Sequence, residues 1–183
     1  RDEKQLKNEI GVVFDESYFH ENLKPKHISG IMSRIYTRWD EALFFEYLKH
    51  FKLPADKNMK DFSRGMKMKL SIATALSHHP KLLILDEATS GLDPIVRNEI
   101  LDLFLEFIQD EEHSILFSSH ITSDLEKVAD YVTFLHEGEI IFSESKDDLL
   151  YSYGLLLCVA EEFKSVDKGD SIGHRASRFG HEI

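Results

Sequence analysis

The stretch KLLILDEATSGLDP, residues 81–94, decides the fold class. Its four apolar residues 82–85 form a continuous run, which is typical of a strand buried on both faces of a parallel sheet. Asp86 and Glu87 follow at once, and Asp93-Pro94 has the residue types that open a helix, with proline at the first helical position. The stretch therefore predicts a strand, a short acidic loop and a helix.

Further elements are predicted on both sides of this stretch. Residues 10–14 (IGVVF) and 114–119 (SILFSS) read as two more buried strands, and residues 131–142 as a hairpin turning at Glu137-Gly138. Helices are expected at about 27–37, at 40–51 with Asp40 as cap, from Ser63 as cap to about His79, and at 121–129. The helix after Asp93 has an apolar stripe that consists of Ile95, Ile100, Leu101, Phe104, Leu105 and Ile108. Strands that alternate with helices indicate an α/β protein with a parallel sheet, and the helical block 27–79 suggests a separate lobe.

Composition limits the function classes. The 183 residues are 42% hydrophobic, enough for a core, and carry a formal net charge of −11, which argues against a nucleic-acid partner. The single cysteine, Cys158, excludes an internal disulfide and reads as an apolar strand residue. No apolar run approaches the roughly 18 residues that a membrane-spanning helix needs.

Asp86, Glu87 and His120 stand directly after predicted strands. Ligands of an open parallel sheet bind at the carboxyl ends of its strands, so we expect these three side chains on one edge. There Asp86 suits Mg²⁺, Glu87 can orient or deprotonate a water, and His120 can contact a terminal phosphate oxygen. Taken singly, an Asp-Glu pair is more often a helix cap and a lone histidine is more often structural, but the whole run is too specific for those readings.

These residues closely resemble the nucleotide-binding subunit of ABC transporters, from Ile10 to about Leu150. LLILDEATSGLDP is similar to the Walker B motif and D-loop, ILFSSH to the switch-histidine strand, and IGVVFDE to the Q-loop strand. FSRGM, residues 62–66, occupies the place of the signature, usually LSGGQ. Three positions depart from the family pattern: Arg64, Met66, and Asp15 where glutamine is usual.

The resemblance implies an α/β fold with a partial RecA-like parallel sheet core and a helical subdomain inserted between the Q-loop and the signature. The corresponding divisions are 1–26 for the Q-loop strand and loop, 27–79 for the helical subdomain, 80–150 for the catalytic core and 151–183 for a C-terminal extension. The segment 151–183 is assigned no chemistry.

The resemblance also implies a role for each matching residue. The catalytic residues are Glu87, which polarises the attacking water, and His120, which senses the γ-phosphate. Magnesium is held by Asp86 through water, with Asp15 as a second oxygen ligand. ATP is contacted by Ser63, Arg64 and Gly65, and Asp93 couples two sites across a dimer. Two readings of Arg64 stay open, a cation at the phosphates or a side chain directed to solvent.

No glycine of this chain is followed by lysine, so the phosphate-binding pattern G-x-x-x-x-G-K-[ST] is missing. In the family this loop precedes the Q-loop, so we expect it upstream of Arg1 and expect the 183 residues alone to be inactive. The implied cofactors are ATP and Mg²⁺. The implied partners are a transmembrane transporter subunit and a second nucleotide-binding subunit, at the inner face of a bacterial membrane.

Two alternatives remain open from the sequence. One is a soluble ABC-type ATPase that acts on nucleic acid or the ribosome, which the acidic charge disfavours. The other is a catalytically degenerate regulatory subunit, for which Asp15 and Arg64 leave room. In the lobe, most of the aromatic side chains of residues 36–51 are expected to pack internally, whereas Tyr18 and Phe19 of the Q-loop are expected to receive the membrane subunit.

Overall fold

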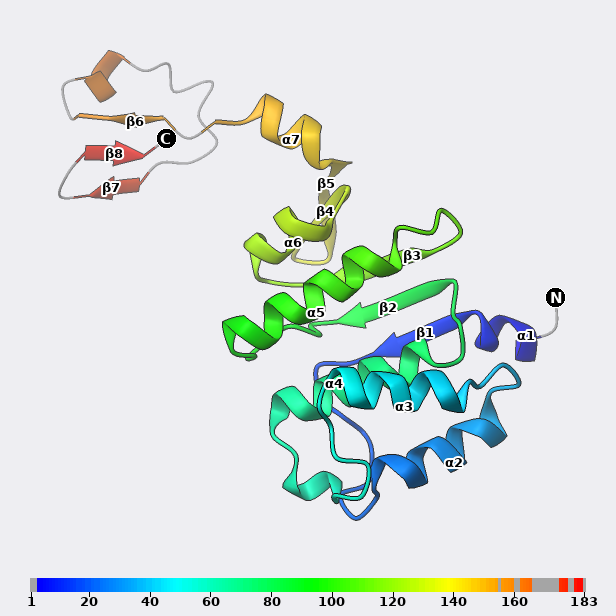
Figure 1. The fold of residues 1–183 in the computed structure, drawn as a ribbon. Coiled ribbons are helices and arrows are strands. Elements are labelled where there is room, and N and C mark those ends of the chain that lie inside the picture. Colours follow the sequence, from blue (N-terminus) through cyan, green and yellow to red (C-terminus); the bar gives the residue numbers. More distant parts are fainter. Residues whose placement is uncertain (1–2, 155, 160–161, 166–174, 178–179, 183) are drawn as a thin grey trace. The chain divides into compact units, whose positions relative to one another are not determined.

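The computed structural model describes all residues except 1–2, 155, 160–161, 166–174, 178–179 and 183 (Figure 1). Contacts divide the chain into two compact units, Arg1–Val128 and Ala129–Ile183. Within the described residues, no helix combines the length and the apolar character needed to cross a membrane. The division into four segments suggested by the sequence stays a prediction.

The first unit is built on a parallel sheet whose described strands lie in the order β1-β2-β3 (Figure 1). They are β1 (Ile10–Val13), β2 (Leu82–Asp86) and β3 (Ser114–Ser118). The central strand is β2, with Leu85 opposite Val13 on one side and opposite Phe117 on the other. The α/β class and the three strands predicted from the sequence are therefore confirmed.

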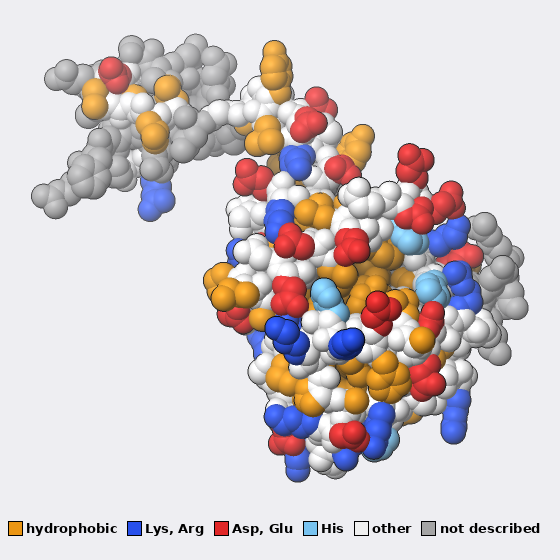
Figure 2. All heavy atoms as spheres, viewed as in Figure 1, with side chains coloured by type: hydrophobic (Ala, Val, Ile, Leu, Met, Phe, Trp, Pro, Cys, Tyr) orange, Lys and Arg blue, Asp and Glu red, His pale blue; other side chains and the backbone are white. Residues whose placement is uncertain are grey.

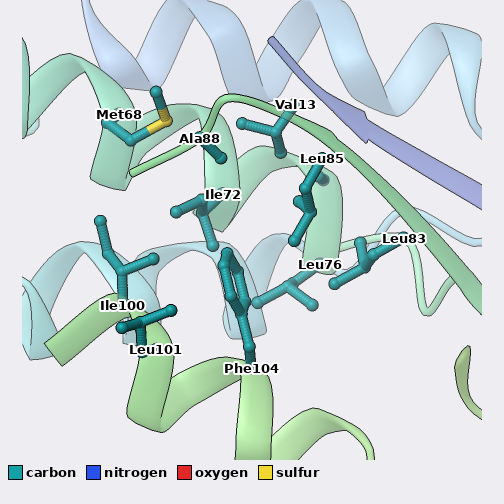
Figure 3. Packing of buried hydrophobic residues seen from close by; sticks show 11 residues of the cluster. Val13, Met68, Ile72, Leu76, Leu83, Leu85, Ala88, Ile100, Leu101 and Phe104 are labelled. Carbon is teal, nitrogen blue, oxygen red and sulfur yellow. The ribbon is translucent and has the colours of Figure 1, made fainter. Parts of the chain in front are cut away.

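Two helices cover one face of this sheet. They are α4 (Arg64–Leu76) and α5 (Pro94–Phe107), and each is capped as predicted, by Ser63 and by Asp93. Figure 3 shows the core between helices and sheet, where Phe104 of α5 points toward Ile72 and Leu76 of α4. Burying these apolar side chains fixes both helices on the sheet, since each fully buried one contributes about 1.5–3 kcal/mol.

Three burial predictions are wrong. The predicted buried strand 10–14 exposes Val12 by 43% and Phe14 by 44%. β3 forms, but its side chains are only partly buried at best, and Leu116 is 63% exposed. The reason is that β3 is the edge strand of the described sheet. Leu116 shares a face of the sheet with Ile84 and, one strand further on, Val12, and α4 and α5 cover the other face. In the predicted stripe of α5, Ile95 is 80% exposed because it lies in the first turn, before the buried residues Ile100, Leu101 and Phe104.

The helical lobe lies between β1 and α4 in the chain, as expected. It consists of α2 (Pro25–Ile35), α3 (Glu41–His50) and the single turn η1 (Met59–Asp61). Asp40 caps α3 by accepting a hydrogen bond from the Leu43 amide at 2.9 Å. The lobe has its own core around the fully buried Phe44, against which Trp39 and Tyr47 pack. The aromatic side chains of this segment therefore pack mainly inside the lobe, as predicted.

The remaining elements are short. In the first unit, α1 (Glu3–Asn8) precedes β1 and α6 (Thr122–Val128) follows β3. In the second unit, β4 (Tyr131–His136) and β5 (Glu139–Ser145) form the predicted hairpin, whose turn residues Glu137 and Gly138 both have positive φ. Next come α7 (Lys146–Ser152), β6 (Leu157–Cys158), η2 (Glu162–Ser165), β7 (Arg175–Ser177) and β8 (Gly180–Glu182). The three last strands pair antiparallel in the order β6-β8-β7, with Cys158 in a strand as expected.

A buried histidine joins α4 to the sheet. His78 is 1% exposed, stacks on Tyr36 with ring centroids 3.9 Å apart, and donates from Nε2 to the Ile10 carbonyl at 3.0 Å. Burial disfavours the charged imidazole and lowers the pKa of His78 below 6.5. Since the unfolded chain then binds a proton that the folded chain does not, His78 lowers stability as the pH falls below 6.5 and has no such effect above it.

This predicts that His78→Gln flattens the pH dependence of stability. Glutamine keeps a donor for the Ile10 carbonyl but cannot be protonated. We expect the free energy of unfolding of the parent to drop more steeply between pH 7.5 and pH 5 than that of the variant, as measured by urea titration. The control is His27→Gln, at an exposed position of α2, which should leave the parental slope. Equal slopes for parent and His78→Gln would contradict the prediction.

Candidate functional site

The site begins where β2 and β3 end together. The register places Asp86 opposite Ser118, and the Ser118 hydroxyl donates to Oδ1 of Asp86 at 2.7 Å. One carboxylate oxygen is thus held by a neighbouring strand. Ser118 was missed by the sequence analysis, although its position two residues before His120, at the end of a predicted strand, was a usable signal.

Glu87 adopts a rare backbone conformation directly after β2. Its φ is +51°, in the left-handed region that non-glycine residues seldom occupy. Its amide donates to Ser118, to the carbonyl at 3.2 Å and to the hydroxyl oxygen at 3.1 Å, which holds the conformation in place. Strained backbone of this kind gathers at functional sites, where the surrounding contacts maintain it.

The Glu87 side chain meets the histidine. Oε2 of Glu87 accepts a hydrogen bond from Nδ1 of His120 at 2.7 Å, with the glutamate side chain 31% exposed and the histidine 67% exposed. Asp86, Glu87 and His120 therefore gather on one edge of the sheet, where sequence reasoning put them. The group is open to solvent, so a carboxylate oriented by an imidazole can reach a water molecule or a ligand there.

The signature segment begins α4. The Ser63 hydroxyl oxygen accepts from the Met66 amide at 3.2 Å, and its hydrogen stays available as a donor. The first amides of a helix lack partners within the helix and form the positive end of its dipole. This end of α4 therefore has donors directed outward that suit an anion.

Arg64 lies over Gly91 in the loop after β2. Gly91 has φ +65°, and a Cβ placed on it would be 2.9 Å from Nη1 of Arg64. Neither sequence reading of Arg64 anticipated this contact. Gly65 faces Val96: a Cβ placed on Gly65 would be 3.5 Å from Cγ1 of Val96. The beginnings of α4 and α5 are therefore side by side.

Asp93 and Asp15 occupy separate places. The Asp93 carboxylate caps α5 by accepting from the amides of Ile95 and Val96, both at 3.1 Å. Asp15 follows β1 at the same strand-end edge as Asp86, and it has no hydrogen-bond or ion-pair partner among the described residues. The described contacts join Asp86, Glu87 and His120 into one group and Arg64 with Gly91 into another.

The donor set fits magnesium bound mainly through water. Within the part of the chain that the structure describes, no three His, Cys, Asp or Glu side chains converge as a protein-made metal cage. Mg²⁺ needs only one or two carboxylates and takes its other ligands from water and phosphate. Asp86, with one oxygen held by Ser118, could supply the hard oxygen ligand that this mode of binding requires.

The chain is similar to known proteins. The family model described as "ABC transporter" matches residues 1–90. The bacitracin transport ATP-binding protein BcrA of Bacillus licheniformis is 36% identical over 146 residues, which cover 77% of this chain and 47% of that protein. The ABC transporter ATP-binding protein NatA of Bacillus subtilis is 32% identical over 164 residues, which cover 81% and 66%.

A solved structure titled "Structure of ATP binding subunit of ABC transporter" has a TM-score of 0.67 at 25% identity, over 81% of this chain and 63% of that chain. The chain therefore belongs to the ABC transporter family, among its ATP-binding subunits. The expected RecA-like α/β core is confirmed. The chain spans about half the length of curated relatives that it matches.

The contact of Arg64 with Gly91 generates a prediction. Gly91→Ala should lower the free energy of unfolding by about 1–2 kcal/mol. The left-handed conformation is unfavourable for alanine, and the alanine methyl group would clash with the guanidinium of Arg64. In an Arg64→Ala background the steric part disappears, so the same substitution should cost less. Urea titration of the four proteins measures both costs.

Gly30→Ala is the matched control. Gly30 lies in α2 with nothing within 4 Å of a Cβ, so alanine should raise stability by about 0.5–1 kcal/mol. An unchanged stability in Gly91→Ala, with the expected gain in Gly30→Ala, would show that the loop does not hold this conformation in solution.

Proposed function

We propose that this chain carries the hydrolytic half of the ATP site of an ABC transporter subunit. The observation that carries the proposal is the 2.7 Å hydrogen bond between His120 and Glu87, beside an Asp86 held by Ser118. One solvent-exposed edge of the sheet thus carries the Asp86 carboxylate, which can bind a cation, the Glu87 carboxylate, which can bind a water molecule, and the His120 imidazole, which can bind a phosphate group. Membership of the ABC transporter family supports it.

Glu87 is the general base in this proposal. Its carboxylate is aimed by the His120 imidazole and by two hydrogen bonds at its own amide, so it can hold the attacking water in one direction. His120 has a second ring nitrogen free to reach the γ-phosphate. Catalysis of phosphoryl transfer depends mainly on such positioning and on stabilisation of charge.

Asp86 would hold magnesium through water, and Asp15, at the same edge, would supply a second oxygen. The ion supplies positive charge at the phosphate oxygens when it is bound. Ser118 keeps one oxygen of Asp86 turned toward β3, which leaves the other for a metal-bound water.

Ser63, Arg64 and Gly65 would contact the phosphates of an ATP held by a second nucleotide-binding subunit. The free donors at the beginning of α4 support this assignment, since helix N-termini attract phosphate groups. Asp93 would lie at the dimer interface. Arg64 would add its positive charge to this phosphate contact from its place over Gly91.

The partner would be a transmembrane transporter subunit, with the chain at the inner face of a bacterial membrane. The relative BcrA, named for bacitracin transport, supports an export-type system. Figure 2 shows Lys and Arg side chains scattered among Asp and Glu on the face that it draws, which does not favour a nucleic-acid partner.

Replacement of the proposed base is the main test. In a polypeptide that carries a phosphate-binding loop ahead of this chain, Glu87→Gln should abolish steady-state hydrolysis and trap a dimer with ATP bound. The reason is that glutamine keeps the size of the side chain but cannot accept the proton. Phosphate release and size-exclusion chromatography with ATP and Mg²⁺ measure the two effects.

Glu46→Gln, at an exposed position of α3, is the control and should leave turnover unchanged. The 183-residue chain alone should release no phosphate above background, since it lacks the motif that binds the phosphates. Turnover at the parental rate in Glu87→Gln would refute the role of Glu87.

The Q-loop generates a second test. Tyr18 is 76% exposed and packs edge-on against Phe14, whereas Phe19 packs partly against the core of the lobe. We therefore expect Tyr18, and not Phe19, to contact the membrane subunit. Tyr18→Ala should weaken co-purification with that subunit and leave ATP binding unchanged, whereas Tyr131→Ala, equally exposed in the second unit, should not. Equal loss of co-purification in both variants would count against a specific contact.

A further inference from the structure

We infer that Arg97 and Asp124 form a positioning pair that holds His120 against Glu87. Its consequence for turnover rests on the proposed function, but the positioning can be tested without ATP. Neither residue belongs to the group of Asp86, Glu87 and His120, and neither touches it through a described hydrogen bond. They act through the two segments that carry that group.

The pair is unusual because its carboxylate is buried. Asp124 is 1% exposed, and neither of its oxygens has a hydrogen-bond partner among the described residues. Nε of Arg97 lies 3.2 Å from Oδ1, an ion-pair distance, without the alignment of a hydrogen bond. A buried carboxylate is strongly disfavoured unless a cation compensates it, so Arg97 is what allows this turn of α6 to be buried.

Both residues lie just beyond the ends of the site. Arg97 is in the first turn of α5, and its amide donates to the Asp93 carbonyl at 2.9 Å. Asp124 is the third residue of α6, four residues after His120. A second bond reinforces the pair, since Nη2 of Arg97 donates to the hydroxyl oxygen of Ser123 at 3.4 Å.

The segments 86–97 and 118–124 are therefore joined to each other at both of their ends. At one end they are joined by the ladder between β2 and β3 and by the bond of Ser118 to Asp86. At the other end they are joined by Arg97 and Asp124. His120 lies between these two attachments, so its distance from Glu87 depends on both.

The alternative is that the ion pair of Arg97 and Asp124 only stabilises the fold and does not position His120. The chain offers a matched comparison, because Lys127 of α6 and Asp102 of α5 form a second ion pair between the same helices at 2.7 Å. Its side chains are more exposed, 32% and 67%, and it lies farther along both helices from the site. Removing it should leave the site unchanged.

The experiment follows the His120 ring by NMR in the 183-residue chain. Its ring signals are identified by their loss in His120→Gln, and Glu87→Ala gives their position without the hydrogen bond to residue 87. In Arg97→Ala we expect the signals to move most of the way toward that position. Arg97→Lys, which keeps the cation, should move them less, and Lys127→Ala should not move them.

Arg97→Ala leaves the Asp124 carboxylate without its cation and can fail to fold. The double variant Arg97→Met with Asp124→Leu removes both charges and keeps apolar packing, so it gives the same test in a folded protein. His78 signals, from a buried ring stacked on Tyr36, report that the chain is folded. Unmoved His120 signals in a folded Arg97→Ala or double variant would overturn the inference.

A kinetic measurement separates the two proposals. In a polypeptide with a phosphate-binding loop, Arg97→Ala should lower kcat by about tenfold to a hundredfold with little change in KM, because a displaced catalytic group slows chemistry more than binding. Moved NMR signals with an unchanged kcat would retain the positioning role and reject the catalytic role of His120. Unmoved signals would reject the positioning role whatever the result for Glu87→Gln.

Discussion

The parallel pairing of β2 with β3 is the constraint on which the rest of the site depends. Its register puts Ser118 opposite Asp86, so that one hydroxyl can hold the Asp86 carboxylate and also receive the Glu87 amide. A slip of one residue would turn Asp86 to the other face of the sheet and break both bonds. Burial of Leu83 and Leu85 beneath α4 and α5 prevents that slip, because it would expose both leucines.

The second constraint is that α4 packs in two hydrophobic cores at once. Met68, Ile72 and Leu76 pack on the sheet, while Leu70 and Ala73 pack in the core of the lobe. One helix therefore belongs to both cores, and a movement of the lobe relative to the sheet would have to move α4 as well. Since Ser63 and Arg64 begin this helix, and Arg64 lies over Gly91, the signature end and the loop after β2 are mechanically connected within one chain.

Local signals predicted the site best where one segment determines the outcome. Asp40, Ser63 and Asp93 were identified as caps because capping depends on an oxygen within three residues of the amides that it binds. Burial was harder to predict. The apolar run 115–117 predicts a buried strand, but the exposure of Leu116 depends on which neighbours cover that face, and no local pattern records this.

The sequence by itself determined the α/β class, the strand-to-helix turn at Asp86-Glu87 and, through its motifs, the resemblance to ABC transporter ATP-binding subunits. Only the tertiary structure showed that Ser118 holds Asp86, that Arg64 lies over Gly91 and that Arg97 compensates the buried Asp124. The physical reason is distance along the chain. Each of these contacts joins residues 27 to 32 positions apart, and its partner is chosen by helix and strand packing and not by local residue order.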